Sequence, residues 1–148
     1  MNYSSWVEFY LDVAAKFATR SKDKSVHVGA VIVDIHRNLR SEGWNGFPRR
    51  VNDNVLERHA RPAKYLWTEH AERNAIYSAA RAGVSTYDCT MYCTHAPCAD
   101  CARAIIQAGI CRLVFPVEAV IPTFTTSTDV ALQMLDEAGV MVVKYDKD

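Results

Sequence analysis

The sequence predicts an α/β fold: a three-layer α-β-α sandwich built around a mixed five-stranded sheet. Short β-branched apolar runs, typical of buried strands, occur between segments whose apolar residues recur at helical spacing. In the second half of the chain strands and helices alternate, which favours parallel strands joined by helical crossovers. In the first half, two strand-like runs are separated only by a short polar turn, which is typical of an antiparallel hairpin.

The expected elements follow in order along the chain. Apolar and aromatic residues from Trp6 to Phe17 recur at helical spacing and predict an amphipathic helix over about residues 4–20. Pro97 is expected to open a later helix, since proline is tolerated in a first helical turn. Glycines are expected to end the later helices. The other predicted elements are a hairpin with strands at 28–34 and 39–44, a helix from about 70 that stops at Gly83, a strand at 89–94, a helix at 97–108, a strand at 111–115, a helix at 129–137 and a strand at 140–145.

The connection over residues 45–67 is long and polar, and a loop of this length inside a compact domain is usually functional. Tyr65, Leu66 and Trp67 lie at its end. These side chains could belong to an interface or a pocket, or equally to the core.

Length and charge narrow the classes of function. The 148 residues contain no repeat or linker, so one domain is expected over 1–148. The formal net charge is zero, so no domain-wide basic field is available for nucleic acid, and none is expected as a partner. No apolar run approaches the ~20 residues of a membrane span, and the N-terminus lacks the pattern of a signal peptide. We therefore expect a cytoplasmic protein without a membrane partner, whose five cysteines stay reduced.

Two short motifs carry the chemistry. His70, Ala71 and Glu72 begin one predicted helix, and Pro97-Cys98-Ala99-Asp100-Cys101 begins another. The positive end of a helix stabilises thiolate over thiol, which suits Cys98 and Cys101 to bind a metal. With His70 they make three ligands and leave a fourth tetrahedral position for water, as in catalytic Zn²⁺ sites.

Glu72 lies two residues beyond the histidine, in the first turn of the same predicted helix. Zinc lowers the pKa of its bound water towards ~7, so hydroxide becomes available as the nucleophile. Glu72 is placed to take a proton from that water, pass it to a ring nitrogen and then protonate the departing amino group. The combined pattern His-x-Glu and Pro-Cys-x-x-Cys is the signature of zinc deaminases, which are hydrolases of an amidine C–N bond.

A closed structural zinc site is the alternative. It would need a fourth ligand from Cys89, Cys93, His95 or Cys111. The three cysteines are more simply interpreted as small buried hydrophobic residues on strands.

The chain resembles the deoxycytidylate (dCMP) deaminase family over most of its length. The Gly-aromatic-Asn-Gly stretch is more discriminating than the zinc motif, which a wider superfamily shares. The residues that carry the resemblance are 20–23, 28–33, Gly43-Trp44-Asn45-Gly46-Phe47-Pro48, 70–76, Met91-Tyr92, 97–101 and 106–110.

The resemblance implies a cytidine deaminase-like fold and hydrolysis of dCMP to dUMP and ammonia. It implies that His70, Cys98 and Cys101 hold Zn²⁺ and that Glu72 is the proton shuttle. Asn45 would hydrogen-bond the deoxyribose hydroxyl, although it could instead be a turn residue beside its glycine. Ala71 and His95 are further candidates for substrate contact. The family also implies a homo-oligomer: a hexamer, trimer or dimer.

Phosphate recognition is where the chain departs from the family. Candidate phosphate ligands are Lys22, Lys24, His27 and Lys64. Relatives often carry a polar or cationic pair after the fourth strand, but here residues 116–124 contain no cation. Deamination of a cytidine, deoxycytidine, guanine or modified base therefore stays open beside dCMP. A tRNA adenosine deaminase and a non-catalytic zinc module are the less favoured alternatives.

Overall fold

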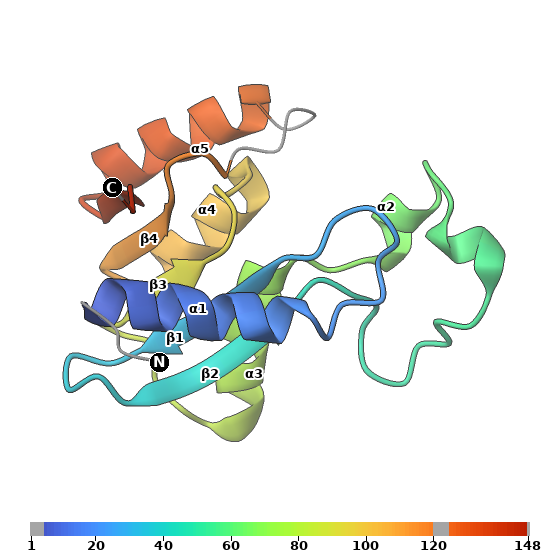
Figure 1. Ribbon diagram of the computed structural model, residues 1–148, viewed down its shortest axis with the longest axis horizontal. Helices are drawn as coiled ribbons and strands as arrows, with labels where there is room; N and C mark the ends of the chain where they lie inside the picture. Colours follow the sequence, from blue (N-terminus) through green and yellow to red (C-terminus); the bar gives the residue numbers. More distant parts are fainter. Residues whose placement is uncertain (1–4, 120–124, 148) are drawn as a thin grey trace.

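A five-stranded mixed sheet forms the centre of the molecule, in the order β2-β1-β3-β4-β5 (Figure 1). The computed structural model describes residues 5–119 and 125–147. β1 pairs antiparallel with β2 and β3, whereas β3, β4 and β5 are parallel, so the predicted mixed sheet is confirmed. The strands are β1 (Gly29–Val33), β2 (Leu39–Trp44), β3 (Thr90–Cys93), β4 (Arg112–Pro116) and β5 (Met141–Tyr145).

Helices cover both faces of the sheet, which confirms the three-layer sandwich. α1 (Trp6–Ala18) packs on one face, where its apolar side joins Val31, Tyr92 and Val114 in one core cluster. The second core cluster lies on the other face and includes residues of the three remaining long helices. These helices are α3 (Ala71–Ala82), α4 (Ala99–Gln107) and α5 (Thr125–Glu137).

Several boundaries differ from the sequence expectations. α4 begins at Ala99 rather than at Pro97, because Cys98 is the N-cap with an extended backbone. α5 begins at Thr125 rather than at 129. The sequence pattern does not predict this first turn because it is rich in threonine and serine and lacks an apolar period. Thr128 in this turn is nevertheless buried and donates a hydrogen bond to the Pro97 carbonyl, at 3.0 Å.

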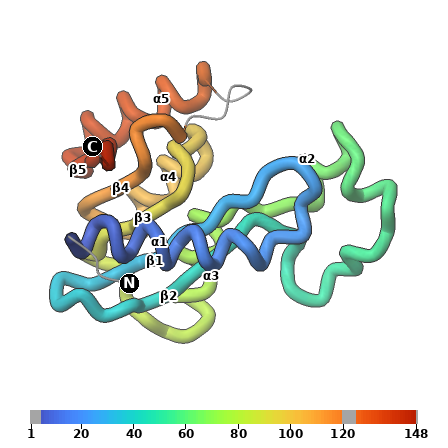
Figure 2. Tube along the Cα trace, in the orientation of Figure 1, coloured from blue at the N-terminus to red at the C-terminus, as the bar shows by residue number. Residues whose placement is uncertain are grey.

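The connection between β2 and α3 is more ordered than a plain loop. It contains the short helices η1 (Leu56–His59) and α2 (Lys64–Trp67). The ribbon and the Cα trace show this segment projecting from the body of the molecule (Figures 1 and 2). No helix among the described residues combines the length and the apolar character needed to cross a membrane.

The cysteines outside the metal motif divide into two groups. Cys89 and Cys93 are buried, as predicted, although Cys89 lies just before β3 rather than within it. The prediction is wrong for Cys111, which is exposed and lies just before β4 rather than within it.

Close approach of backbones fixes α3 on the sheet. Gly43 in β2 lies so near α3 that a Cβ there would come within 2.4 Å of the Ala71 carbonyl oxygen and the Ala75 nitrogen. Ser41 donates a hydrogen bond to the Ala75 carbonyl at 2.8 Å, and Asn74 donates one to the Trp44 carbonyl at 2.8 Å. Only glycine permits this spacing, which sets where the N-terminus of α3 lies.

Gly43→Ala is expected to lower the free energy of unfolding by about 1–3 kcal/mol or more, because the added methyl overlaps backbone atoms that cannot move independently. Urea denaturation measures the change. Gly46→Ala is the matched control, since a Cβ there would meet no atom within 4 Å. A Gly43→Ala protein as stable as the wild type would contradict the expectation.

Candidate metal centre and pocket

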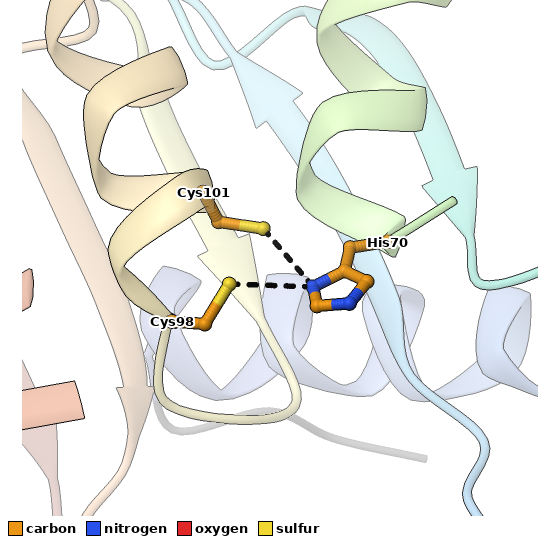
Figure 3. Close-up of side chains that lie close together, drawn as sticks. All are labelled: His70, Cys98 and Cys101. Carbon is orange, nitrogen blue, oxygen red and sulfur yellow. Dashed lines mark hydrogen bonds between the residues drawn. The ribbon is translucent and has the colours of Figure 1, made fainter. Parts of the chain in front are cut away.

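Three side chains that could hold a metal ion meet where two helices begin (Figure 3). His70 is the N-cap of α3, and Cys98 is the N-cap of α4, with Cys101 in the first turn of α4. The His70 Nδ1 atom lies 3.4 Å from the Sγ atom of each cysteine. All three ligand atoms lie within 4.8 Å of one another.

These separations fit Zn²⁺. In a tetrahedral site with Zn–S of about 2.3 Å and Zn–N of about 2.0 Å, the nitrogen and sulfur atoms lie about 3.5 Å apart. The measured 3.4 Å agrees closely with that spacing. Within the described residues the cluster has three members, and none of Cys89, Cys93, His95 and Cys111 belongs to it. The donor set therefore matches a three-ligand zinc site.

The ligand atoms change one another's proton affinity. A hydrogen bond from Cys101 and another from His70 outweigh burial and lower the pKa of Cys98 to about 4. The hydrogen bond to Cys98 outweighs burial of the ring and raises the pKa of His70. Cys98 is thus a thiolate near neutral pH, which is the form that binds a metal.

Glu72 lies in the first turn of α3, beside this cluster. Its side chain is only 4% exposed, and burial raises the pKa of its carboxyl group, although the nearby His70 opposes the shift. Cys93 is buried next to it, and burial raises the pKa of that thiol well above its usual range. A carboxyl group with a raised pKa is suited to accept and return a proton near neutral pH.

Arg73 connects the two helix starts. Its Nε atom donates to the Glu69 carboxylate at 2.6 Å, and its Nη1 atom lies 3.5 Å from the Asp100 carboxylate in α4. The arginine therefore ties the start of α3 to the start of α4, which helps to hold the three candidate metal ligands together.

A pocket of about 370 Å³ opens beside the cluster, which is within the size range of small-molecule sites. Its lining includes His70, Glu72 and Cys98. Four of the residues predicted to contact substrate also line it: Asn45, Lys64, Ala71 and His95. Burial lowers the pKa of His95, so its imidazole is neutral near neutral pH.

The structure does not bring Lys24 and His27 into this pocket, and both side chains are exposed. The reason is a turn centred on Asp23, whose carboxylate accepts hydrogen bonds from the backbone nitrogens of Ser25 and Val26, at 2.8 and 3.0 Å. The turn places the intervening side chain in solvent. Lys22 is likewise exposed and forms an ion pair with Asp53 at 2.9 Å, outside this pocket.

Asn45 is braced rather than free to rotate. Its Oδ1 atom accepts a hydrogen bond from the Val28 backbone nitrogen at 2.8 Å, and its Nδ2 atom donates to the Val26 carbonyl at 2.9 Å. The side chain is therefore part of the turn before β1 and also of the pocket lining. The amide retains a second N–H and a second lone pair for a ligand.

Lys64 and Asp23 form an ion pair in the pocket wall, with Nζ 3.2 Å from Oδ2 and side chains only 9% and 11% exposed. Lys64→Met is expected to lower the free energy of unfolding by about 3 kcal/mol, because it leaves a buried carboxylate without its cation. Lys22→Met, which breaks an ion pair whose lysine is 68% exposed, should cost less than about 1 kcal/mol. Equal losses in the two variants, measured by urea denaturation, would contradict the expectation.

The loss of unfolding free energy caused by Lys64→Met should depend on pH. Burial tends to raise the pKa of Asp23, but backbone hydrogen bonds from Ser25 and Val26 and the Lys64 ammonium together lower it. A carboxyl whose folded pKa is lowered stabilises the fold above its unfolded pKa of about 3.9 and loses that effect as the pH falls further. The difference between wild type and Lys64→Met should therefore shrink below about pH 4.

The structure also shows charged pocket residues that sequence reasoning missed, chiefly Arg61 and Arg73. Glu69 and Arg73 are four residues apart across the start of α3, and this spacing is a signal that could have identified their ion pair. Arg61 lies in an irregular segment beside a proline and gives no such signal. The stretch 116–124, which contains no cation, is described by the structure only as far as residue 119, and residues 120–124 lie outside the described residues.

The aromatic stretch before His70 is not core. Tyr65 and Leu66 are 52% and 90% exposed, and Tyr65 lines the pocket. Trp67 packs against Phe47, with ring centroids 6.2 Å apart. Of the two interpretations of this stretch, the structure favours the pocket or interface.

Known proteins resemble this chain in sequence and in fold. The family model described as "Cytidine and deoxycytidylate deaminase zinc-binding region" matches residues 4–117. An "Uncharacterized deaminase in luxG 3'region" of Aliivibrio fischeri is 38% identical over 141 residues, which cover 94% of this chain and 92% of that protein. The deoxycytidylate deaminase of Mus musculus is 39% identical over 119 residues, which cover 77% of this chain and 66% of the mouse protein.

The comparison of folds agrees with the sequence matches. The crystal structure of dCMP deaminase from the cyanophage S-TIM5, in complex with dCMP and dUMP, superposes with a TM-score of 0.78 at 28% identity. The superposition covers 98% of this chain and all of the phage chain. Together with the His-Cys-Cys cluster, these matches show that the chain belongs to the cytidine and deoxycytidylate deaminase family of zinc-dependent hydrolytic enzymes.

Proposed function

We propose that this protein hydrolyses the 4-amino group of dCMP to give dUMP and ammonia. The observation that carries the proposal is a buried carboxyl group, Glu72, next to a His-Cys-Cys cluster in the wall of a nucleotide-sized pocket. The similarity to deoxycytidylate deaminases and to a phage enzyme solved with dCMP and dUMP supports this choice of substrate.

In this proposal His70, Cys98 and Cys101 hold the zinc ion. Bound zinc supplies Lewis acidity that makes hydroxide available from water at neutral pH. Glu72 takes the proton that water releases and delivers it to the ring nitrogen next to the reacting carbon. Glu72 then takes the remaining proton from the hydroxyl group newly bonded to the reacting carbon and gives it to the amino group. The C–N bond breaks, a carbonyl forms, ammonia leaves and the carboxylate is restored.

Asn45 and His95 would orient the substrate. The braced amide of Asn45 offers its remaining donor and acceptor to a sugar hydroxyl. His95, held through a 2.9 Å contact between its Nδ1 atom and the Thr94 hydroxyl, places a neutral ring against the ligand. Because both groups are fixed before substrate arrives, they add to binding without a further ordering cost.

The direct test is to follow ultraviolet absorbance on dCMP, deoxycytidine, CMP and dCTP in parallel with zinc-loaded protein. We expect preference for dCMP, with turnover abolished in Glu72→Ala. Equal or better turnover of deoxycytidine would favour a nucleoside deaminase instead. No turnover of any of the four by zinc-loaded protein would overturn the dCMP assignment and direct the search to other amino-heterocycles.

We also propose that the protein is a homo-oligomer. The exposed side chains of Tyr65 and Leu66, on the segment that projects from the body, support this proposal. Light scattering after size-exclusion chromatography should give the mass of a dimer, trimer or hexamer. A monomer at micromolar concentration would contradict the proposal.

A further inference from the structure

Arg61 stands apart from the other cations of the pocket. Its side chain is exposed and lines the pocket. Within residues 5–119 and 125–147, no carboxylate lies within ion-pair distance of its guanidinium, and no hydrogen bond engages it. Arg61 is thus a pocket cation whose charge no described side chain of this protein neutralises.

The neighbouring cations are already engaged. Lys64 is buried against Asp23, and Arg73 is bound to Glu69 and Asp100. Arg58, on the same projecting segment, lies with its guanidinium 3.9 Å from the centre of the Trp67 ring and does not line the pocket. An anion entering the pocket would therefore meet one uncommitted guanidinium, that of Arg61.

The backbone around Arg61 is held in place. The Lys64 nitrogen donates to the Ala60 carbonyl at 2.8 Å, and the Tyr65 nitrogen donates to the Pro62 carbonyl at 3.2 Å. The buried Lys64–Asp23 ion pair then joins this segment to the turn before β1. Arg61 is accordingly presented from an anchored stretch of chain, which reduces the entropy lost when it binds a ligand.

The two ends of the pocket differ in how far their charged side chains are buried. Glu72, beside the metal-binding cluster, is only 4% exposed, whereas Arg61 is open to solvent. In a nucleoside monophosphate the exocyclic amino group and the 5′-phosphate lie at opposite ends of the molecule. A ligand whose base reaches the closed end thus leaves its phosphate towards the open end.

We propose that Arg61 binds the 5′-phosphate of the substrate and so determines preference for a nucleotide over a nucleoside. The inference rests on the proposed function, and it deepens that function by assigning the phosphate contact. A guanidinium suits this role because it donates two parallel hydrogen bonds to phosphate oxygens. It offers a cation that residues 116–119 do not provide.

Equilibrium binding of the reaction product tests the assignment without relying on turnover. Titration calorimetry on zinc-loaded protein would compare dUMP with deoxyuridine for the wild type, Arg61→Ala and Arg58→Ala. We expect Arg61→Ala to weaken binding of dUMP relative to deoxyuridine by about 10-fold to 100-fold, the effect of losing a charge-assisted contact. Arg58→Ala removes the same charge from the same segment and should leave the ratio unchanged.

Two outcomes would overturn the assignment. One is a wild-type protein that binds dUMP no more tightly than deoxyuridine. The other is an Arg61→Ala protein whose ratio matches that of the wild type. Failure of the proposed function has a different signature: the wild type binds dUMP in the Arg61-dependent manner but does not turn over dCMP.

Discussion

Replacing Glu72 by glutamine is expected to lower kcat by about 10²-fold to 10⁴-fold while zinc stays bound. Glutamine keeps the size and the hydrogen-bonding atoms of the side chain but cannot carry a proton between water, the ring nitrogen and the leaving amino group. The candidate metal-binding cluster does not include Glu72, so zinc content should not change. Steady-state kinetics on dCMP and zinc analysis by mass spectrometry measure the two effects separately.

Glu137→Gln is the matched control, because Glu137 ends α5, is exposed and does not line the pocket. Its kcat should stay within about tenfold of the wild-type value, since it provides no acid–base catalysis. Burial raises the pKa of Glu72, so the acidic limb of the wild-type rate profile should lie above the ordinary glutamate pKa. A zinc-replete Glu72→Gln enzyme with near wild-type kcat would exclude the proton shuttle.

Replacing Cys101 by serine is expected to remove zinc and, with it, all activity. The Cys101 side chain is fully buried in the first turn of α4, and its Sγ atom lies 3.4 Å from the His70 Nδ1 atom. A serine hydroxyl does not ionise near neutral pH and is a poor zinc ligand, so zinc affinity should fall by more than about 100-fold, beyond the losses seen for supporting residues around a metal. Zinc content should fall from about one ion per chain to near zero after dialysis.

The same variant should also lose the stability that zinc gives the wild type. A chelator should lower the melting temperature of the wild type, because zinc binds the folded chain in preference to the unfolded one. The chelator should have little further effect on Cys101→Ser. Cys111→Ser is the control, since that thiol is exposed and outside the cluster. A Cys101→Ser protein that retains zinc through dialysis would show that the three-ligand assignment is wrong.

The order and type of the elements could be predicted from the sequence because they depend on short-range patterns. The apolar run at β1 is fully buried, and the helices after it show the period that the sequence predicts. The clustering of His70, Cys98 and Cys101 could also be predicted from the sequence. Its histidine and cysteines lie at helix starts, so the backbone itself directs them towards one point.

Sequence patterns could not predict which side chains of the irregular segments enter the pocket. Lys24 and His27 were candidates by charge alone, but the Asp23 turn leaves both in solvent. Lys64 does line the pocket, although it is bound there to Asp23. Where the backbone has no period, hydrogen bonds to distant partners decide which side chains enter a cavity.

The sequence by itself determined the fold class and the composition of the candidate site: a histidine, two cysteines and a glutamate at two helix starts. Only the tertiary structure decided which charges reach the pocket. Arg61 and Arg73 come from different segments and differ in their partners: Arg73 is paired with two carboxylates, whereas Arg61 has no charged partner among the described residues. The physical reason is the different distance along the chain over which the two kinds of interaction act. Helix and strand patterns depend on neighbours a few residues apart, whereas a binding surface depends on side chains that only folding brings together.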